Sequence, residues 1–221
     1  MSDTARTVLV TGAVADFTRL EEVRELAEWV GREHPRLDVL VNNAGTAGME
    51  GRVVTRDGHE LTLQVNYLAP YLLTRLLWEP LMAGPAGRVV NVSSSLHRSG
   101  HLHWGDLNYA SRYSRVAVYA QSKLALTMFA KGLAEYGQSG PAAVAVHPGV
   151  VATALMSIYG RIGGPVGEGA TAVTHLAAPG MRLVNGAYYN GPSLGHAAPL
   201  VADRRSIGRL WKLSARLTGL A

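Results

Sequence analysis

Short runs of β-branched and aliphatic residues alternate along this chain with longer stretches in which apolar residues recur every three or four positions. Short apolar runs bounded by turn residues are typical of buried strands. Such runs predict strands at residues 7–11, 38–41, 87–94, 142–147 and 187–189. Strands that alternate with helices indicate a parallel sheet built from βαβ units.

The stretches with helical spacing predict the helices that connect these strands. Thr18 and Glu21 have the spacing of a capping box, so we expect the first helix to begin at Thr18 and to end near His34. A long helix is expected at 60–82, where Pro70 introduces a kink. Further helices are predicted at 115–136, after the glycine-rich loop 160–169, and at 202–217.

The predicted fold class is therefore α/β, with a Rossmann-like, doubly wound parallel sheet in a single domain over residues 1–221. The absence of cysteine excludes disulfides and thiolate metal sites, and it favours the cytoplasm. The N-terminus lacks the apolar core of a signal peptide. No apolar run approaches the ~20 residues of a membrane span, so none is expected.

The net charge of +5 arises from 21 basic and 16 acidic residues, which are spread along the chain apart from a basic cluster in the last predicted helix. Aromatic residues do not interleave with a basic stripe, so we expect no nucleic-acid partner. The last helix has apolar residues on one face and arginines on the other. We expect it to dock on the sheet rather than to lie on a membrane.

Seven short motifs follow one another along the chain. They are Asn42-Asn-Ala-Gly45, Val65-Asn66-Tyr-Leu, Val90-Asn-Val-Ser-Ser94, Tyr119-xxx-Lys123, His147-Pro-Gly149-Val-Val-Ala-Thr153, Asn185-Gly-Ala-Tyr-Tyr and Leu210-Trp-Lys-Leu-Ser. In this order they resemble the short-chain dehydrogenase/reductase family, and more narrowly its retinol-dehydrogenase-like members. The resemblance covers nearly the whole chain. It implies an oxidoreductase ancestry, NAD(P)(H) as cofactor and a small-molecule substrate.

The candidate catalytic residues are Ser94, Tyr119, Lys123 and Asn66. Tyr119 and Lys123 are four positions apart, so they share one face of a helix. A free phenol titrates near 10, and a nearby ammonium favours its ionised form. Tyr119 can then act as a general acid toward a carbonyl or as a base toward an alcohol. Ser94 ends the neighbouring strand and can bond to the same substrate oxygen. The resemblance implies that Asn66 holds a water that relays protons to Lys123.

The cofactor-binding half departs from the family pattern. The family's first turn resembles Thr-Gly-x-x-x-Gly-x-Gly, whose glycines let backbone amides approach a pyrophosphate. Here Thr11 and Gly12 match, but the segment that follows leads directly to Asp16. The residues from Asp16 onward resemble the end of the family's third strand, where an aspartate lies near the adenine. Strands 2 and 3, with their helices, are thus expected to be missing together, on the order of 50 residues.

This loss reduces the sheet on one edge and leaves the first strand as an exposed edge. The Asp16 carboxylate would lie at the positive end of the first helix and repel phosphate, so we expect impaired cofactor binding. The residues that the resemblance assigns to the cofactor are Gly12, Asp16, Asn43, Ala44, Gly45, Tyr119, Lys123, Pro148, Gly149, Val151 and Thr153.

Several functional alternatives stay open. The chain is a nicotinamide-dependent oxidoreductase, a non-redox isomerase, dehydratase or cyclase that uses the same residues, or a catalytically silent binding homologue; a further alternative is that the gap is an error in the gene sequence. Apolar residues in the predicted lid 153–167 favour a polyketide, steroid-like or isoprenoid substrate; they are Leu155, Met156, Ile158, Tyr159 and Ile162. The family resemblance implies a homodimer through the helices around Leu72 and Leu124. We expect His97, His101 and His103 to serve in loop packing or substrate contacts, and no metal site.

Overall fold

The computed structural model describes residues 6–12, 15–137, 140–153, 155, 158 and 163–221. Among these, six strands form one sheet in the order β1-β2-β3-β4-β5-β6, so strands that are consecutive in the sequence are neighbours in space. The first five run parallel and the last is antiparallel. The strands are β1 (Val8–Val10), β2 (Val39–Asn42), β3 (Arg88–Val92), β4 (Ala142–His147), β5 (Tyr188–Asn190) and β6 (Ser193–Leu194).

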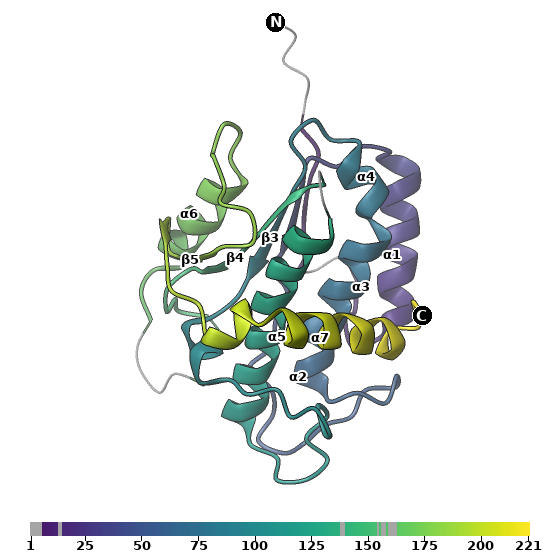
Figure 1. Ribbon diagram of the computed structural model, residues 1–221, viewed down its shortest axis with the longest axis vertical. Helices are drawn as coiled ribbons and strands as arrows, with labels where there is room; N and C mark the ends of the chain where they lie inside the picture. Colours follow the sequence, from purple (N-terminus) through teal and green to yellow (C-terminus); the bar gives the residue numbers. More distant parts are fainter. Residues whose placement is uncertain (1–5, 13–14, 138–139, 154, 156–157, 159–162) are drawn as a thin grey trace, which may run out of the picture.

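Helices cover both faces of this sheet, which confirms the predicted doubly wound α/β class (Figure 1). Alternate residues along a strand point to opposite faces. Leu40 and Val89 accordingly pack with α1, α3, α5 and α7, whereas Val41 and Val90 pack with Leu176 of α6. The helices are α1 (Leu20–Glu33), α2 (Leu61–Leu63), α3 (Ala69–Leu76), α4 (Trp78–Met82), α5 (Arg115–Tyr136), α6 (Val166–Ala177) and α7 (Arg204–Leu217).

The crossover through α6 differs from those before it. Each crossover steps in the same direction across the sheet, because the spatial order is the sequence order. Helices α1, α3 and α5 return over one face, and α6 returns over the other. The α6 crossover therefore has the opposite hand to the earlier ones, a departure from the rule that such connections share one hand.

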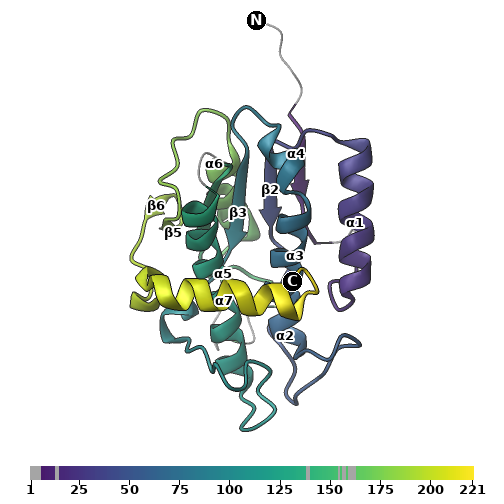
Figure 2. The same cartoon turned by 45° about the vertical axis from the view of Figure 1, so that its right-hand side comes forward.

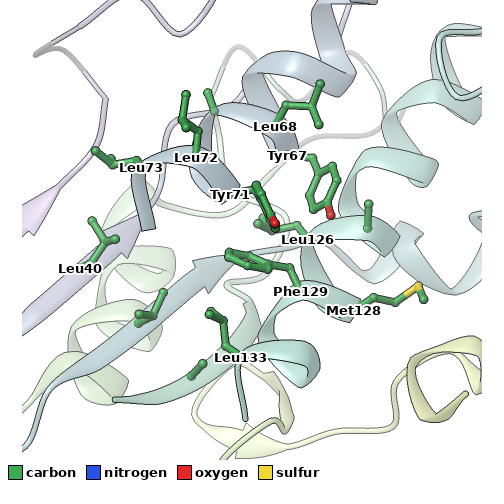
Figure 3. Close-up of a cluster of buried hydrophobic side chains, with 14 of the residues drawn as sticks. Leu40, Tyr67, Leu68, Tyr71, Leu72, Leu73, Leu126, Met128, Phe129 and Leu133 are labelled. Atoms are coloured by element: carbon green, nitrogen blue, oxygen red, sulfur yellow. The ribbon is translucent and has the colours of Figure 1, made fainter. Parts of the chain in front are cut away.

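The larger core lies between the sheet and the three helices α3, α5 and α7. Figure 3 shows Tyr71 of α3 facing Phe129 of α5, and the two ring centres are 5.0 Å apart. The rings of Trp211 in α7 and Tyr71 pack edge to face, with their centres 5.6 Å apart. Ile207 and Leu210 of α7 belong to the same cluster. The last helix thus docks on the protein, but it packs mainly on the helices α5 and α3 rather than on the sheet as expected, and Figure 2 shows α7 crossing in front of α5. Within the part of the chain that the structure describes, no helix is long and apolar enough to cross a membrane.

Strand β1 lies at the edge of the sheet, as expected, but the prediction that it is buried is wrong. Val8 and Val10 are 47% and 51% exposed. These side chains point to the face that carries α6, and α6 packs over β3 and β4 rather than over β1. An apolar strand is buried only where a neighbouring layer covers it, and the sequence pattern does not show that layer.

The predicted 60–82 helix is interrupted twice. A π-helical turn, η1 (Gln64–Leu68), lies directly before Pro70, and a second break occurs at Leu77, where φ is −90° and ψ is 13°. Proline has no N–H, so the carbonyl four residues before it cannot make its usual helical bond, and π-helical turns accommodate such defects. This turn contains the fully buried Asn66.

The start of α1 does not follow the predicted capping box. The helix begins at Leu20, and its N-cap residue Arg19 makes no side-chain cap. The Leu20 amide instead donates to Asp57 Oδ2 at 2.9 Å, and the Gln64 side chain donates to the same oxygen at 2.7 Å. A carboxylate that is 37 residues away in sequence therefore caps the helix, a contact that local spacing cannot reveal.

Substituting this distant cap is expected to destabilise the fold. Asp57→Ala should lower the free energy of unfolding by about 1 kcal/mol, the usual effect of removing a side-chain cap. Urea denaturation measures this change. The matched control is Glu21→Ala, which removes the carboxylate that the capping box would use and whose side chain is 75% exposed. Greater destabilisation by Glu21→Ala than by Asp57→Ala would contradict the cap by Asp57 and support the capping box of Thr18 and Glu21.

Candidate active site

A cavity of about 120 Å³ lies at the carboxyl ends of β3 and β4, above the start of α5. Seven of the site residues predicted from the sequence line this cavity: Asn43, Tyr119, Lys123, Pro148, Gly149, Val151 and Thr153. Ser93 and His147 also line it and were not predicted, although both lie inside recognised motifs. The predicted residues Gly12, Asp16, Ala44, Gly45, Asn66 and Ser94 are not among the described residues that line this cavity.

Tyr119 and Lys123 come from the same buried face of α5, and each is only 2% exposed. The Lys123 Nζ atom lies 5.7 Å from the centre of the Tyr119 ring and donates a hydrogen bond to the Val92 carbonyl at 2.8 Å. Burial disfavours the charged form of an amine and lowers the pKa of Lys123 to about 8. The ammonium therefore persists at neutral pH beside the phenol ring and is lost in mildly alkaline solution.

The side chains of Asn66 and Lys123 both approach the backbone at Gly45. A methyl group added at Gly45 would lie 3.2 Å from Asn66 Oδ1 and 3.4 Å from Lys123 Nζ. Asn66 Oδ1 accepts from the Thr46 amide at 2.7 Å, and its amide group donates to the Thr46 carbonyl and to Ser122 Oγ. The structure thus places the predicted Asn66 next to Lys123, and three hydrogen bonds fix the orientation of the Asn66 side chain. The water relay stays a prediction.

Ser94 follows the end of β3 and is 1% exposed. Its Oγ accepts a hydrogen bond from the Leu96 amide at 3.0 Å, which starts the short helical segment η2 (Ser95–Ser99). Its carbonyl accepts from His97 Nδ1 at 2.7 Å. Ser93, one residue earlier, bonds to the Lys123 carbonyl and to Thr127, so it ties β3 to α5.

His97 is fully buried and connects Ser94 to the C-terminal part of the chain. Its Nε2 atom accepts from the Ala198 amide at 3.1 Å, so the ring proton lies on Nδ1, which donates to Ser94. Burial lowers the pKa of His97 and favours this neutral form. The other two histidines lie apart, because His101 bonds to the Ser99 carbonyl and His103 packs against the Tyr109 ring. Loop packing therefore describes His97 and, through its ring contact, His103; His101 is exposed, and substrate contacts stay a prediction.

Between β1 and α1, three backbone amides of the described residues already bond to carboxylates. Asp16 Oδ1 accepts from the Thr18 amide at 2.9 Å, Glu22 accepts from the Asp16 amide at 2.8 Å, and Asp57 accepts from Leu20. Hydrogen bonds from Thr18 lower the pKa of Asp16, which keeps it charged. One carboxylate thus caps the first amide of α1 and two more lie on the segment that leads into it, at a helix end that would otherwise attract an anion.

Among the described residues, the two ends of the site expected for the dinucleotide cofactor differ. The cavity is lined by residues that the family resemblance assigns to the cofactor, namely Asn43, Tyr119, Lys123, Pro148, Gly149, Val151 and Thr153. At the expected pyrophosphate side, a methyl group on Gly12 would meet Asn43 Nδ2 at an ordinary 3.6 Å, so none of the described neighbours requires glycine there. The expected impairment of cofactor binding stays a prediction.

Thr11 has a role that the sequence motifs did not predict. Its Oγ1 atom accepts hydrogen bonds from the amides of Asn43 and Ala44, each at 3.0 Å. The Asn43 side chain donates in return to the Thr11 carbonyl at 3.1 Å. The end of β1 therefore holds in place the segment that ends at Gly45, beside Lys123.

Comparisons with known proteins agree with the motifs. Residues 3–160 match the family model described as short chain dehydrogenase. The chain is 38% identical to human retinol dehydrogenase 13, over 93% of this chain and 67% of that protein. It is also 38% identical to a putative daunorubicin C-13 ketoreductase of Streptomyces sp. (strain C5), over 93% of this chain and 73% of that protein.

Solved structures share the fold. A putative uncharacterized protein from Mycobacterium paratuberculosis superposes with a TM-score of 0.76 at 31% identity, covering 93% of this chain and 74% of that one. A blue fluorescent protein from a metagenomic library, in complex with NADPH, gives a TM-score of 0.60 at 30% identity, with 80% and 72% covered. The family match, the relatives and the shared fold together show that the chain belongs to the short-chain dehydrogenase/reductase family, among its retinol-dehydrogenase-like members.

Proposed function

We propose that this short-chain dehydrogenase/reductase-type enzyme uses Tyr119 to transfer a proton to or from the oxygen of a carbonyl or hydroxyl group on a mostly apolar small molecule. The observation that carries this proposal is the pairing of Tyr119 and Lys123 in one cavity, where both side chains are almost fully buried. A phenol that faces a cavity beside a buried ammonium is suited to general acid–base catalysis.

Each residue has a separate task in this proposal. Tyr119 donates its hydroxyl proton to a carbonyl oxygen, or accepts the proton of an alcohol. Lys123 favours the phenolate through its positive charge, and Ser94 bonds to the substrate oxygen. Asn66 lies beside Lys123 and would hold the water that returns the proton.

The names of the relatives support this substrate class. One relative is named for an alcohol, retinol, and another for a ketone, the C-13 carbonyl of daunorubicin. Retinol, the first of these, has an apolar body that carries its hydroxyl group. In this chain Leu155 of the predicted lid lines the catalytic cavity and Ile158 is described, whereas Met156, Tyr159 and Ile162 lie outside the described residues.

NAD(P)(H) is the cofactor of this chain by ancestry, since structures of related proteins contain NADPH. When bound, a nicotinamide cofactor supplies or accepts hydride. The three carboxylates at the start of α1 favour weak binding of the pyrophosphate group. This observation supports the second candidate function, a non-redox isomerase, dehydratase or cyclase that uses the same proton-transfer residues.

The protonation of Lys123 can be measured directly, because the chain contains only three lysines, at 123, 131 and 212. With ¹³Cε-labelled lysine, we expect one NMR signal to titrate near pH 8 and to be missing in Lys123→Met. Below that pH the ammonium is present. Above it kcat/KM should fall about tenfold per pH unit if the ammonium supports Tyr119.

The matched control for this titration is Lys131→Met, on the same helix. Its ammonium lies 3.9 Å from Glu135 and is partly exposed, so the early signal and the alkaline fall of activity should both persist. A spectrum in which no lysine signal moves below about pH 9.5 would contradict the proposed state of Lys123.

The quaternary structure and the compartment stay predictions. Leu72 and Leu124 themselves are fully buried within one chain, so a homodimer would have to use other residues of the same helices. Sedimentation velocity measures the oligomeric state. A cytoplasmic location is likewise proposed from the cysteine-free composition.

A further inference from the structure

A second cavity, of about 320 Å³, opens on the sheet face that carries α6, between this helix and the edge strand β1. We call it the β1–α6 groove. Its strand side is formed by Val8, Val10 and Val41, and its helix side includes Val166 and Val173. Its volume lies within the range of small-molecule sites, which are about 300–1,000 Å³ and mostly apolar.

The walls of the groove are unusually exposed for valines. Val8, Val10 and Val166 are 47%, 51% and 54% exposed, although all three face the same cavity. None of the described residues that line the groove is charged. Apolar surface of this kind is stabilised when an apolar ligand displaces water from it. A phosphate-bearing ligand would find no cation among these residues.

The groove adjoins the catalytic cavity. Five residues, Asn43, Val92, Pro148, Val151 and Thr153, line both of them. Polarity changes across this shared wall, because Tyr119, Lys123 and His147 belong to the catalytic side and the valines to the other. A molecule that lies across the boundary would therefore have one polar end and one apolar body.

We propose that the β1–α6 groove binds the apolar body of the substrate, with its carbonyl or hydroxyl end in the catalytic cavity beside Tyr119. This inference rests on the proposed function for the identity of the polar end, whereas binding in the groove is independent of it. The groove exists because, within the described ranges of the chain, no strand or helix covers β1 on this face. The expected reduction of the sheet edge thus creates a binding surface.

Nile red, a neutral dye whose emission rises in apolar surroundings, provides the test. We expect saturable binding to the wild-type protein and displacement by decan-2-one, which has an apolar chain and one ketone. Val10→Lys should weaken Nile red binding at least tenfold, because it places an ammonium on the groove wall. Val184→Lys, at a valine that is 52% exposed and outside the groove, should leave binding unchanged.

Further variants separate this inference from the proposed function. Tyr119→Phe should bind Nile red as the wild type does, even where it abolishes turnover. If circular dichroism shows that Val10→Lys is unfolded, Val166→Lys replaces it, since this residue begins α6 and is exposed. Equal Nile red affinity in a folded groove variant and the wild type would overturn the inference. So would a dimer that Val10→Lys dissociates, because a second copy of the chain would then occupy the groove.

Discussion

Replacement of Tyr119 by phenylalanine is expected to lower kcat by about 10²–10⁴-fold on any apolar ketone or secondary alcohol that the wild-type protein turns over. The substitution removes the hydroxyl that transfers the proton and keeps the ring. Tyr119 is only 2% exposed, so the ring packs in the interior of the protein and the fold should not change. Steady-state kinetics on a substrate found by screening measures the effect.

The matched control for this substitution is Tyr113→Phe. Tyr113 lies shortly before α5, and its hydroxyl donates to the Met49 carbonyl at 2.8 Å, away from the described lining of the catalytic cavity. Its loss should leave kcat within a factor of about two, as surface hydrogen bonds contribute little. Unchanged turnover in Tyr119→Phe would remove the acid–base assignment. If the chain is only a binding homologue, the same variant should retain full affinity for its partner.

In calorimetric titration, we expect the Kd for NADPH and for NADH to exceed about 1 mM. Hydrogen bonds to charged groups contribute about 1.5–3 kcal/mol each. Each tenfold change in Kd corresponds to about 1.4 kcal/mol, so losing several such bonds takes a micromolar Kd beyond millimolar. The Asp16, Glu22 and Asp57 carboxylates already accept from the amides of Thr18, Asp16 and Leu20, which lead into α1 or begin it.

Two comparisons sharpen this titration. Nicotinamide mononucleotide lacks the adenosine half, so it should bind no more weakly than NADH if only the nicotinamide side of the site is retained. Asp16→Asn with Glu22→Gln removes two negative charges and should tighten NADPH binding, because like charges repel. Micromolar binding of NADPH to the wild type would contradict the non-redox alternative. No binding up to millimolar concentration would contradict dehydrogenase activity.

Much of the fold was predictable because its signals are local. The helix Arg115–Tyr136 and the strand Ala142–His147 match their predicted bounds, since their apolar patterns are long and uninterrupted. The contacts that sequence reasoning missed are those between distant segments. Asp57 caps α1 from another loop, and Thr11 holds the amides of Asn43 and Ala44.

The candidate site was predictable to the same extent. Motif order placed Tyr119 and Lys123 in one cavity, because both lie on a single regular helix. The exposure of Val8 and Val10 was not predictable, since it depends on which layer covers the strand rather than on the strand itself. The groove followed only from the positions of β1 and α6 in space.

The order of the strands also bears on how this protein is made. In a sheet of order 3-2-1-4-5-6, the first strand is synthesised early but pairs on one side with a strand that emerges much later. Here every strand pairs with the next one in the sequence. Contacts between neighbouring segments form faster than distant ones, and domains begin to fold from the N-terminus during synthesis. The sheet can therefore grow one crossover at a time as the chain leaves the ribosome.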